Sequence, residues 1–68
     1  MSSEIFKVIE IVGSSPDGVD HAIRNAVGKA AVTIRNIRWF EVVETRGHVA
    51  EGAVVHFQVT LKIGFTLD

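Results

Sequence analysis

The stretches NIRWFEVVETRG (residues 36–47) and FQVTLKIGF (residues 57–65) decide the fold that we expect for this chain. Both are dense in β-branched and aromatic residues, which favour β-strands. The first stretch holds the only tryptophan of the chain. Between them, Glu51-Gly52 suits a two-residue turn that would place Ala50 opposite Ala53. We therefore predict an antiparallel hairpin of strands 37–49 and 53–67.

This register assigns the side chains of the hairpin to two faces, because directly opposed residues share a face. The face expected to form the core carries Phe40, Val42, Val55, Phe57, Val59, Leu61, Ile63, Phe65 and Leu67, with Phe40 opposite Ile63 and Val42 opposite Leu61. The other face is expected to pair Glu41 with Lys62, Thr45 with Gln58, and Trp39 with Gly64. A bulge at Gly47 would shift the half of the hairpin nearer the turn.

An apolar strand and a helix precede the hairpin. Residues 4–13 predict a strand with apolar side chains on both faces, which in an antiparallel sheet implies a second cover from another chain. We predict a helix over residues 16–35, because apolar residues recur there on one stripe, and its alanines would let it approach the sheet closely. The stripe consists of Val19, Ala22, Ile23, Ala26, Val27, Ala30, Ala31 and Ile34.

Helix-start and helix-end signals flank this stripe. Ser15 is expected to cap the helix, with Pro16 at its first position and Asp17 in its first turn. Arg35 would complement the negative C-terminal end of the helix. As an alternative role, the N–H groups of residues 13–15 could cradle a phosphate, but the spacing of a phosphate-binding loop is missing.

The order strand–helix–strand–strand predicts a single α+β domain. A helix returning over the sheet makes the first two strands parallel, so the third fits antiparallel between them. The expected β-α-β-β fold is thus a three-stranded antiparallel sheet of order 1-3-2 packed on one helix, with the Trp39 strand at an edge. Because the 68 residues are 47% hydrophobic and include no cysteine, we expect oligomerisation to brace the small core.

Composition and motifs argue against several classes of protein. A net charge of −1 and a pI near 6.3 give no electrostatic basis for binding nucleic acid or an anionic membrane. No apolar run approaches the roughly 20 residues of a membrane-spanning helix, and no signal peptide is expected, so we predict a cytoplasmic protein. We expect no catalytic site, and no metal site either, because strand parity places His48 and His56 on opposite faces.

Trp39, on the face away from the helix, is the strongest candidate for a functional residue. An indole there is either an interface anchor or a stacking platform for a flat ligand. Gln58, expected on the same face, offers a donor and an acceptor that suit the edge of a heterocycle. Because the two residues lie six positions apart along the strands, roughly 20 Å, a ligand that contacts both must lie between subunits.

The chain also resembles a known family, the dodecins. The resemblance covers nearly the whole chain and rests on VIEIVGSS (residues 8–15), an alanine-striped helix, WFEV (residues 39–42), Arg46-Gly47 and QVTLKIGF (residues 58–65). It implies a small flavin-binding protein with a β-α-β-β fold, assembled as a hollow homododecamer of 23 symmetry. It also implies that flavins bind in pairs at two-fold axes, sandwiched between tryptophans of neighbouring subunits, here Trp39.

The resemblance implies further residues of such a site. Gln58 matches the glutamine that hydrogen-bonds the isoalloxazine, and Arg46 matches a position that helps to hold a phosphate tail. By position, Glu44, Thr45 and His48 would line the entrance, or else are ordinary solvated strand residues.

The function implied is non-enzymatic flavin storage and sequestration, with photoprotective quenching of the excited flavin. The expected ligand is FMN or riboflavin, and FAD and coenzyme A are further candidates. Some relatives carry arginine where this chain has Thr66, which weakens the case for FMN over riboflavin. The alternative is a coenzyme A-binding or structural shell in which Trp39 mainly anchors an interface. A flavin enzyme ranks third, because stacked flavins leave little room for a substrate.

Overall fold

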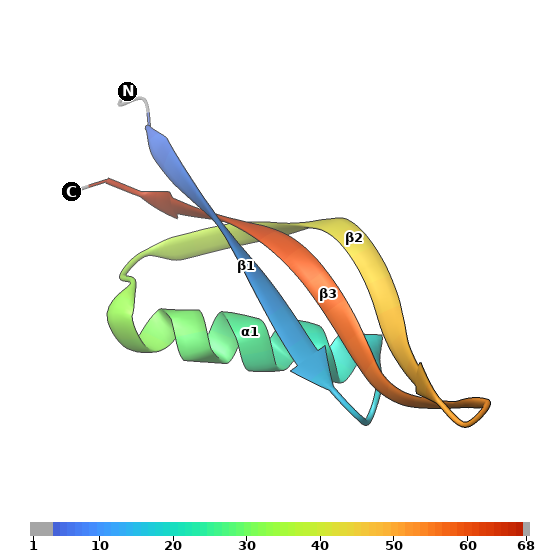
Figure 1. Ribbon diagram of the computed structural model, residues 1–68. Coiled ribbons are helices and arrows are strands. Elements are labelled where there is room, and N and C mark those ends of the chain that lie inside the picture. Colours follow the sequence, from blue (N-terminus) through green and yellow to red (C-terminus); the bar gives the residue numbers. More distant parts are fainter. Residues whose placement is uncertain (1–3, 68) are drawn as a thin grey trace.

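One helix covers one face of a three-stranded sheet in the computed structural model, which describes residues 4–67 (Figure 1). The elements are β1 (Phe6–Ser15), α1 (Val19–Thr33), β2 (Ile37–Ala50) and β3 (Ala53–Thr66). The sheet order is β1-β3-β2, and β3 pairs antiparallel with both of its neighbours. The predicted α+β class, β-α-β-β order and 1-3-2 sheet are therefore confirmed.

The ends of the helix differ from the prediction. α1 begins at Val19 rather than residue 16 and ends at Thr33 rather than residue 35, so Pro16, Asp17 and Arg35 lie outside it. Its N-cap is Gly18, with a φ of 147° and no side-chain cap hydrogen bond. The chain extends as β1 up to Ser15, and the three residues that follow form the connection. The predicted Ser15 cap is thus wrong.

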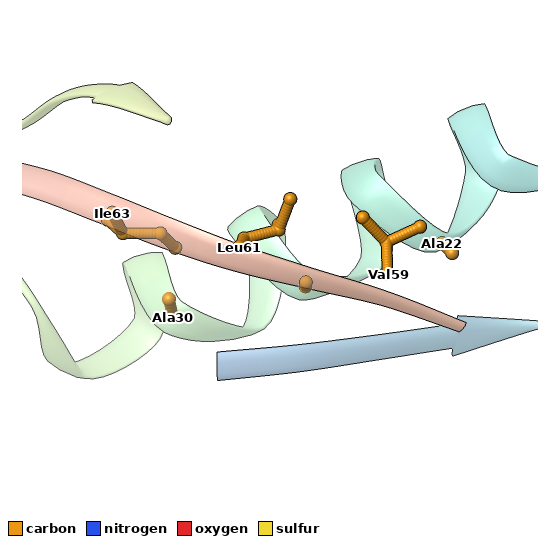
Figure 2. Packing of buried hydrophobic residues seen from close by; sticks show 6 residues of the cluster. Ala22, Ala30, Val59, Leu61 and Ile63 are labelled. Atoms are coloured by element: carbon orange, nitrogen blue, oxygen red, sulfur yellow. The ribbon is translucent and has the colours of Figure 1, made fainter. Parts of the chain in front are cut away.

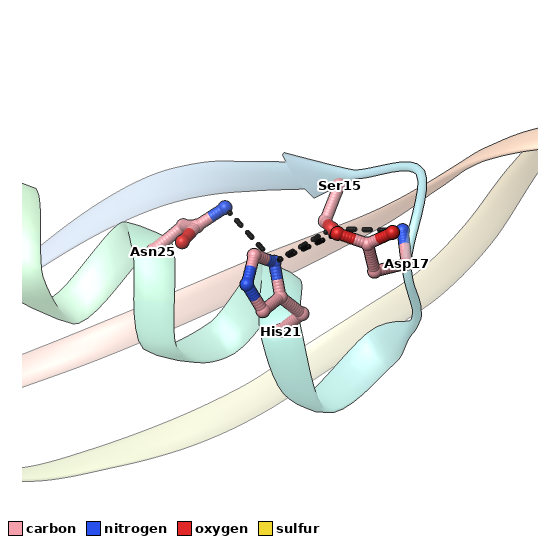
Figure 3. Close-up of polar contacts among 4 residues, drawn as sticks. All are labelled: Ser15, Asp17, His21 and Asn25. Carbon is pink, nitrogen blue, oxygen red and sulfur yellow. Dashed lines mark hydrogen bonds and ion pairs between the residues drawn. The ribbon is translucent and has the colours of Figure 1, made fainter.

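Ser15 instead fixes the connection between β1 and α1 (Figure 3). Its side chain is buried, and its Oγ accepts a hydrogen bond of 3.0 Å from the backbone N–H of Asp17. The same Oγ lies 2.9 Å from Nδ1 of His21, in the first turns of the helix. Because a hydroxyl both donates and accepts, these bonds satisfy a buried polar group that would otherwise cost about 1–3 kcal/mol.

The register of the β2–β3 hairpin agrees with the prediction at the turn and from Trp39 to Val42, and differs between these segments and at Ile37, which lies opposite Phe65. Ala50 lies opposite Ala53, and Trp39 lies opposite Gly64, as expected. Between them Val43 is an extra residue in β2, and Val55 is a compensating extra residue in β3. These two bulges, rather than one at Gly47, shift the pairing of the intervening segment by one residue.

The core lies between α1 and the two strands that the helix contacts most, β1 and β3. Its buried members are Ala22, Ala26 and Ala30 from the helix and Val59, Leu61 and Ile63 from β3 (Figure 2). The approach is closest at Gly13 of β1, where a Cβ would overlap the carbonyl oxygen of Ala22 and lie 2.7 Å from the Cβ of Ala26. The predicted close approach of an alanine stripe is confirmed.

Much of the expected core face stays uncovered. Phe40 is 48% exposed, and Val42, Val55 and Leu67 are also exposed, contrary to the prediction. The reason is that α1 packs mainly on β1 and β3, while the β2–β3 hairpin projects past the helix (Figure 1). The radius of gyration is accordingly 14.1 Å, compared with about 11 Å for a compact domain of this length.

We expect Gly13→Ala to lower the free energy of unfolding by about 1–3 kcal/mol, because the added methyl forces the helix away from β1. Gly28→Ala is the matched control, since a Cβ there meets nothing within 4 Å and alanine stabilises a helix interior by about 0.5–1 kcal/mol over glycine. Thermal unfolding at equal protein concentrations measures both. A Gly13→Ala protein as stable as the native chain would contradict the close packing.

Candidate functional site

The face of the sheet away from α1, here called the outer face, has two chemically distinct ends. Its aromatic end carries Phe6 and Val8 of β1, Gly64 of β3 and Trp39 of β2. Its polar end consists of Ser14 of β1, Gln58 and His56 of β3, and Arg46 and His48 of β2. Cross-strand pairing places these residues together, because directly opposed residues project to the same face.

Trp39 lies across the central strand of the sheet. Its partner in the ladder is Gly64, and a Cβ at Gly64 would overlap three atoms of the indole, Cδ2, Cε2 and Cζ2. The ring therefore covers the backbone of β3 at the one position where no side chain interferes. Beyond β3 it reaches Phe6 of β1, with ring centroids 6.0 Å apart and an interplanar angle of 61°. This edge-on geometry is favourable for aromatic pairs.

The aromatic end is open to solvent. Trp39 is 37% exposed although one side of its ring covers Gly64, and Phe6 and Val8 beside it are 40% and 46% exposed. A large aromatic side chain held in place by packing, with apolar neighbours, suits contact with a flat apolar partner. The structure thus places Trp39 on the outer face and on an edge strand, as the sequence predicts.

The two bulges build the polar end. They place Arg46 opposite Gln58 and His48 opposite His56, whereas Thr45 lies opposite Val59 on the face that α1 covers. The predicted Thr45–Gln58 pair is therefore wrong, and Arg46 has the place expected for Thr45.

A surface ion pair sits beside this row. The Nη2 of Arg46 donates a hydrogen bond of 2.9 Å to Oε1 of Glu44, and both side chains are 57% exposed. Exposed pairs of this kind contribute little to stability. A guanidinium has five N–H donors, so this pair leaves others available for an anion.

A shallow polar hollow of about 260 Å³ lies at the same end, lined by Ser14, His48, His56 and Gln58. The expectation that His48 and His56 point to opposite faces is wrong, because the extra residue Val55 restores their parity. Ser14 and His56 were missed as site residues. Ser14 lies opposite Gln58 because β1 continues past the predicted end at residue 13, and His56 joins the site through its pairing with His48. Trp39 and Gln58 remain separated, because the ladder partner of Trp39 is six residues from Gln58 along β3.

Two larger hollows on the helix side are apolar. One, of about 480 Å³, lies between α1 and Phe40 of β2, and another, of about 510 Å³, lies between α1 and β1. Their apolar linings fit packing surfaces better than binding sites for polar ligands. Among residues 4–67, no three His, Cys, Asp or Glu side chains are grouped so that they could hold a metal ion. The described helix is not long and apolar enough to cross a membrane.

Comparison with known proteins agrees with this fold. The family model described as Dodecin matches residues 5–68. The dodecin of Thermus thermophilus is 42% identical over 65 residues, which cover 96% of this chain and 94% of that protein. The solved structure of the Streptomyces coelicolor dodecin is 53% identical and matches with a TM-score of 0.94, covering 100% of this chain and 97% of that chain.

A more distant relative is named for calcium. The solved structure of calcium dodecin from Mycobacterium tuberculosis, described as calcium chelating, is 29% identical and matches with a TM-score of 0.82. It covers 94% of this chain and 91% of that chain. The sequence resemblance to dodecins is confirmed by the family model, by the identities and by the shared fold. The chain belongs to the dodecin family.

Proposed function

We propose that this chain binds flavin by stacking the isoalloxazine ring on Trp39, and that it stores and sequesters the flavin without catalysing a reaction. The observation that carries this proposal is the indole fixed on Gly64 with its other side open to solvent. A ring held in this way is already oriented for stacking, so little conformational entropy is lost when a flat ligand binds. Membership in the dodecin family, whose resemblance implies flavin binding, supports the same reading.

The site is proposed to form between subunits of a homododecamer of 23 symmetry. Trp39 and Gln58 of one chain lie roughly 20 Å apart, so they do not reach one isoalloxazine together. A two-fold axis across the outer face would bring the polar end of one chain to the aromatic end of its neighbour. Gln58 would then hydrogen-bond the edge of a ring that Trp39 stacks. The exposed apolar side chains of the outer face would be covered in the same step.

The proposed ligand is FMN or riboflavin, and FAD remains a third candidate. Arg46 would contact the phosphate of FMN by a charge-assisted hydrogen bond, and Glu44 and His48 would line the approach beside it. Thr45 is not proposed to contact the ligand, because it lies opposite Val59 on the face toward the helix. Thr66, next to the aromatic end, adds no cation for a phosphate.

Stacking would also protect the flavin from photochemistry. The indole is rich in electrons and the isoalloxazine is poor in them, so close contact gives the excited flavin a fast non-radiative decay. The alternative function is a shell that holds coenzyme A or serves as a scaffold, with Trp39 as an interface anchor. The apolar surface left uncovered on a single chain favours assembly under either function.

Titration of riboflavin and FMN into flavin-free protein tests the proposal. We expect saturable quenching of flavin fluorescence near one flavin per chain. Trp39→Ala should weaken binding by about 1–3 kcal/mol, the contribution of stacking a base on an aromatic side chain. Trp39→Phe is the matched control and should keep part of the affinity. If both flavins stay fluorescent with the native protein, the chain does not bind them by stacking.

Gly64→Ala should weaken flavin binding with Trp39 still present. The added Cβ would occupy the position of the indole and displace it from β3. The emission of this single tryptophan should shift and become more accessible to acrylamide. Gly47→Ala is the control, because its nearest contact, the carbonyl oxygen of His56, is at 3.4 Å. Unchanged emission and affinity in Gly64→Ala would show that Gly64 does not position the platform.

Arg46→Ala should separate the two flavins. We expect the affinity for FMN to fall by about 1.5–3 kcal/mol, the scale of a hydrogen bond to a charged group, and the affinity for riboflavin, which lacks the phosphate, to change little. Isothermal titration with each ligand measures the difference. Equal losses for the two ligands would mean that Arg46 acts on the fold or on the ring rather than on the phosphate.

A further inference from the structure

We propose that the polar end of the outer face binds a divalent transition-metal ion, with Zn²⁺ as its probe, through the imidazoles of His48 and His56 of one chain. Within one chain this pair lies at the opposite end of the outer face from Trp39, and because the proposed flavin site also includes His48, the metal is tested on flavin-free protein. The inference does not rest on flavin binding. It rests on the pairing of the two histidines, on the hollow that they share and on their lack of other partners.

Pairing brings the two imidazoles within bridging range. His48 and His56 are directly opposed in the ladder, so their Cβ atoms are expected about 4.5–5.5 Å apart on one face. A tetrahedral zinc ion with bonds of about 2.0–2.1 Å needs two ligand nitrogens roughly 3.3 Å apart. Both imidazoles line the same hollow, so we expect side-chain rotation to bring their nitrogens to this separation.

Both imidazoles are available for coordination. His48 and His56 are exposed, and within residues 4–67 neither takes part in a hydrogen bond or an ion pair. His21, the third histidine, differs in this respect because its Nδ1 lies 2.9 Å from Oγ of Ser15 (Figure 3). Neutral imidazole is a preferred ligand of zinc, copper and nickel. The two free histidines, and not His21, therefore carry the proposal.

A backbone irregularity creates this pair. Val55 is the extra residue of a bulge in β3, and without it Val55 would lie opposite His48 while His56 pointed to the other face. Bulges re-aim side chains and are over-represented beside functional sites. Here the bulge changes the two histidines from a separated pair into neighbours.

The proposed site is an open one. Only two of the four tetrahedral positions would be filled by imidazoles, because no third histidine, cysteine or carboxylate joins the group among the described residues. Ser14 and Gln58 line the same hollow and supply oxygen atoms near it. Water or a small anion would complete the coordination, as in zinc sites that keep an exchangeable position.

Calorimetric titration of Zn²⁺ into the flavin-free native protein, in a buffer that does not chelate metals, tests the proposal. We expect saturable binding of one Zn²⁺ per chain. His48→Gln and His56→Gln should each weaken it about tenfold or more, because a single imidazole cannot chelate the ion. His21→Gln is the matched control and should bind within about twofold of the native protein, since His21 is not a ligand.

Crystals of the native protein soaked in Zn²⁺ give a second measurement that needs no variant. An anomalous-scattering peak between His48 and His56 would support the site. The proposal is overturned if the native protein does not bind Zn²⁺, or if the His48→Gln/His56→Gln double variant binds as tightly as the native chain. Loss of binding in His21→Gln, or a peak elsewhere with none at this pair, would overturn it as well. None of these outcomes depends on whether the chain binds flavin.

Discussion

The structure depends on one constraint, which is that the helix is too short for the sheet it has to cover. The fifteen residues of α1 span roughly 22 Å, while the fourteen residues of β2 or β3 extend to roughly 46 Å. A close fit of small residues at Gly13 and the helix alanines secures the covered half. The remaining half of the hairpin projects with its apolar side chains exposed, and hydrophobic burial there requires another chain.

On the outer face, two bulges change the pairing of one segment of the β2–β3 ladder, and the ladder continues on both sides of that segment. An extra residue in β2 and an extra residue in β3 cancel, so the turn at Ala50 and Ala53 and the Trp39–Gly64 pair keep the same register. The segment between the bulges at Val43 and Val55 changes its pairing. That segment presents Arg46 and His48 beside Gln58 and His56, and it turns Thr45 toward the helix side. The positions of the two extra residues therefore determine which side chains form the polar end.

Most of the fold was predictable from local sequence signals. The hairpin turn, the aromatic strands and the alanine stripe each have a short-range cause, and together they determine the sheet order and the position of Trp39 over Gly64. The helix start was not predictable in the same way. The hydroxyl of Ser15 could either cap α1 or hydrogen-bond within the loop, and in the structure it contacts His21 and the backbone of Asp17. Local sequence does not distinguish these two arrangements. The bulges escaped prediction for a similar reason. Val43 and Val55 are β-branched residues typical of regular strands, so their identity does not mark them as the extra residues of bulges.

The sheet order also bears on how the chain folds. Among residues 4–67, β1 and β2 each pair with β3 and not with each other, and β3 follows both of them in sequence. During synthesis, the two edge strands therefore emerge before the strand that joins them, and neither finds its ladder partner until β3 has been made. Non-local strand pairing of this kind is slow and leaves strand edges exposed to other chains. The indole platform is subject to the same delay, because Gly64 belongs to the central strand and is translated after Trp39.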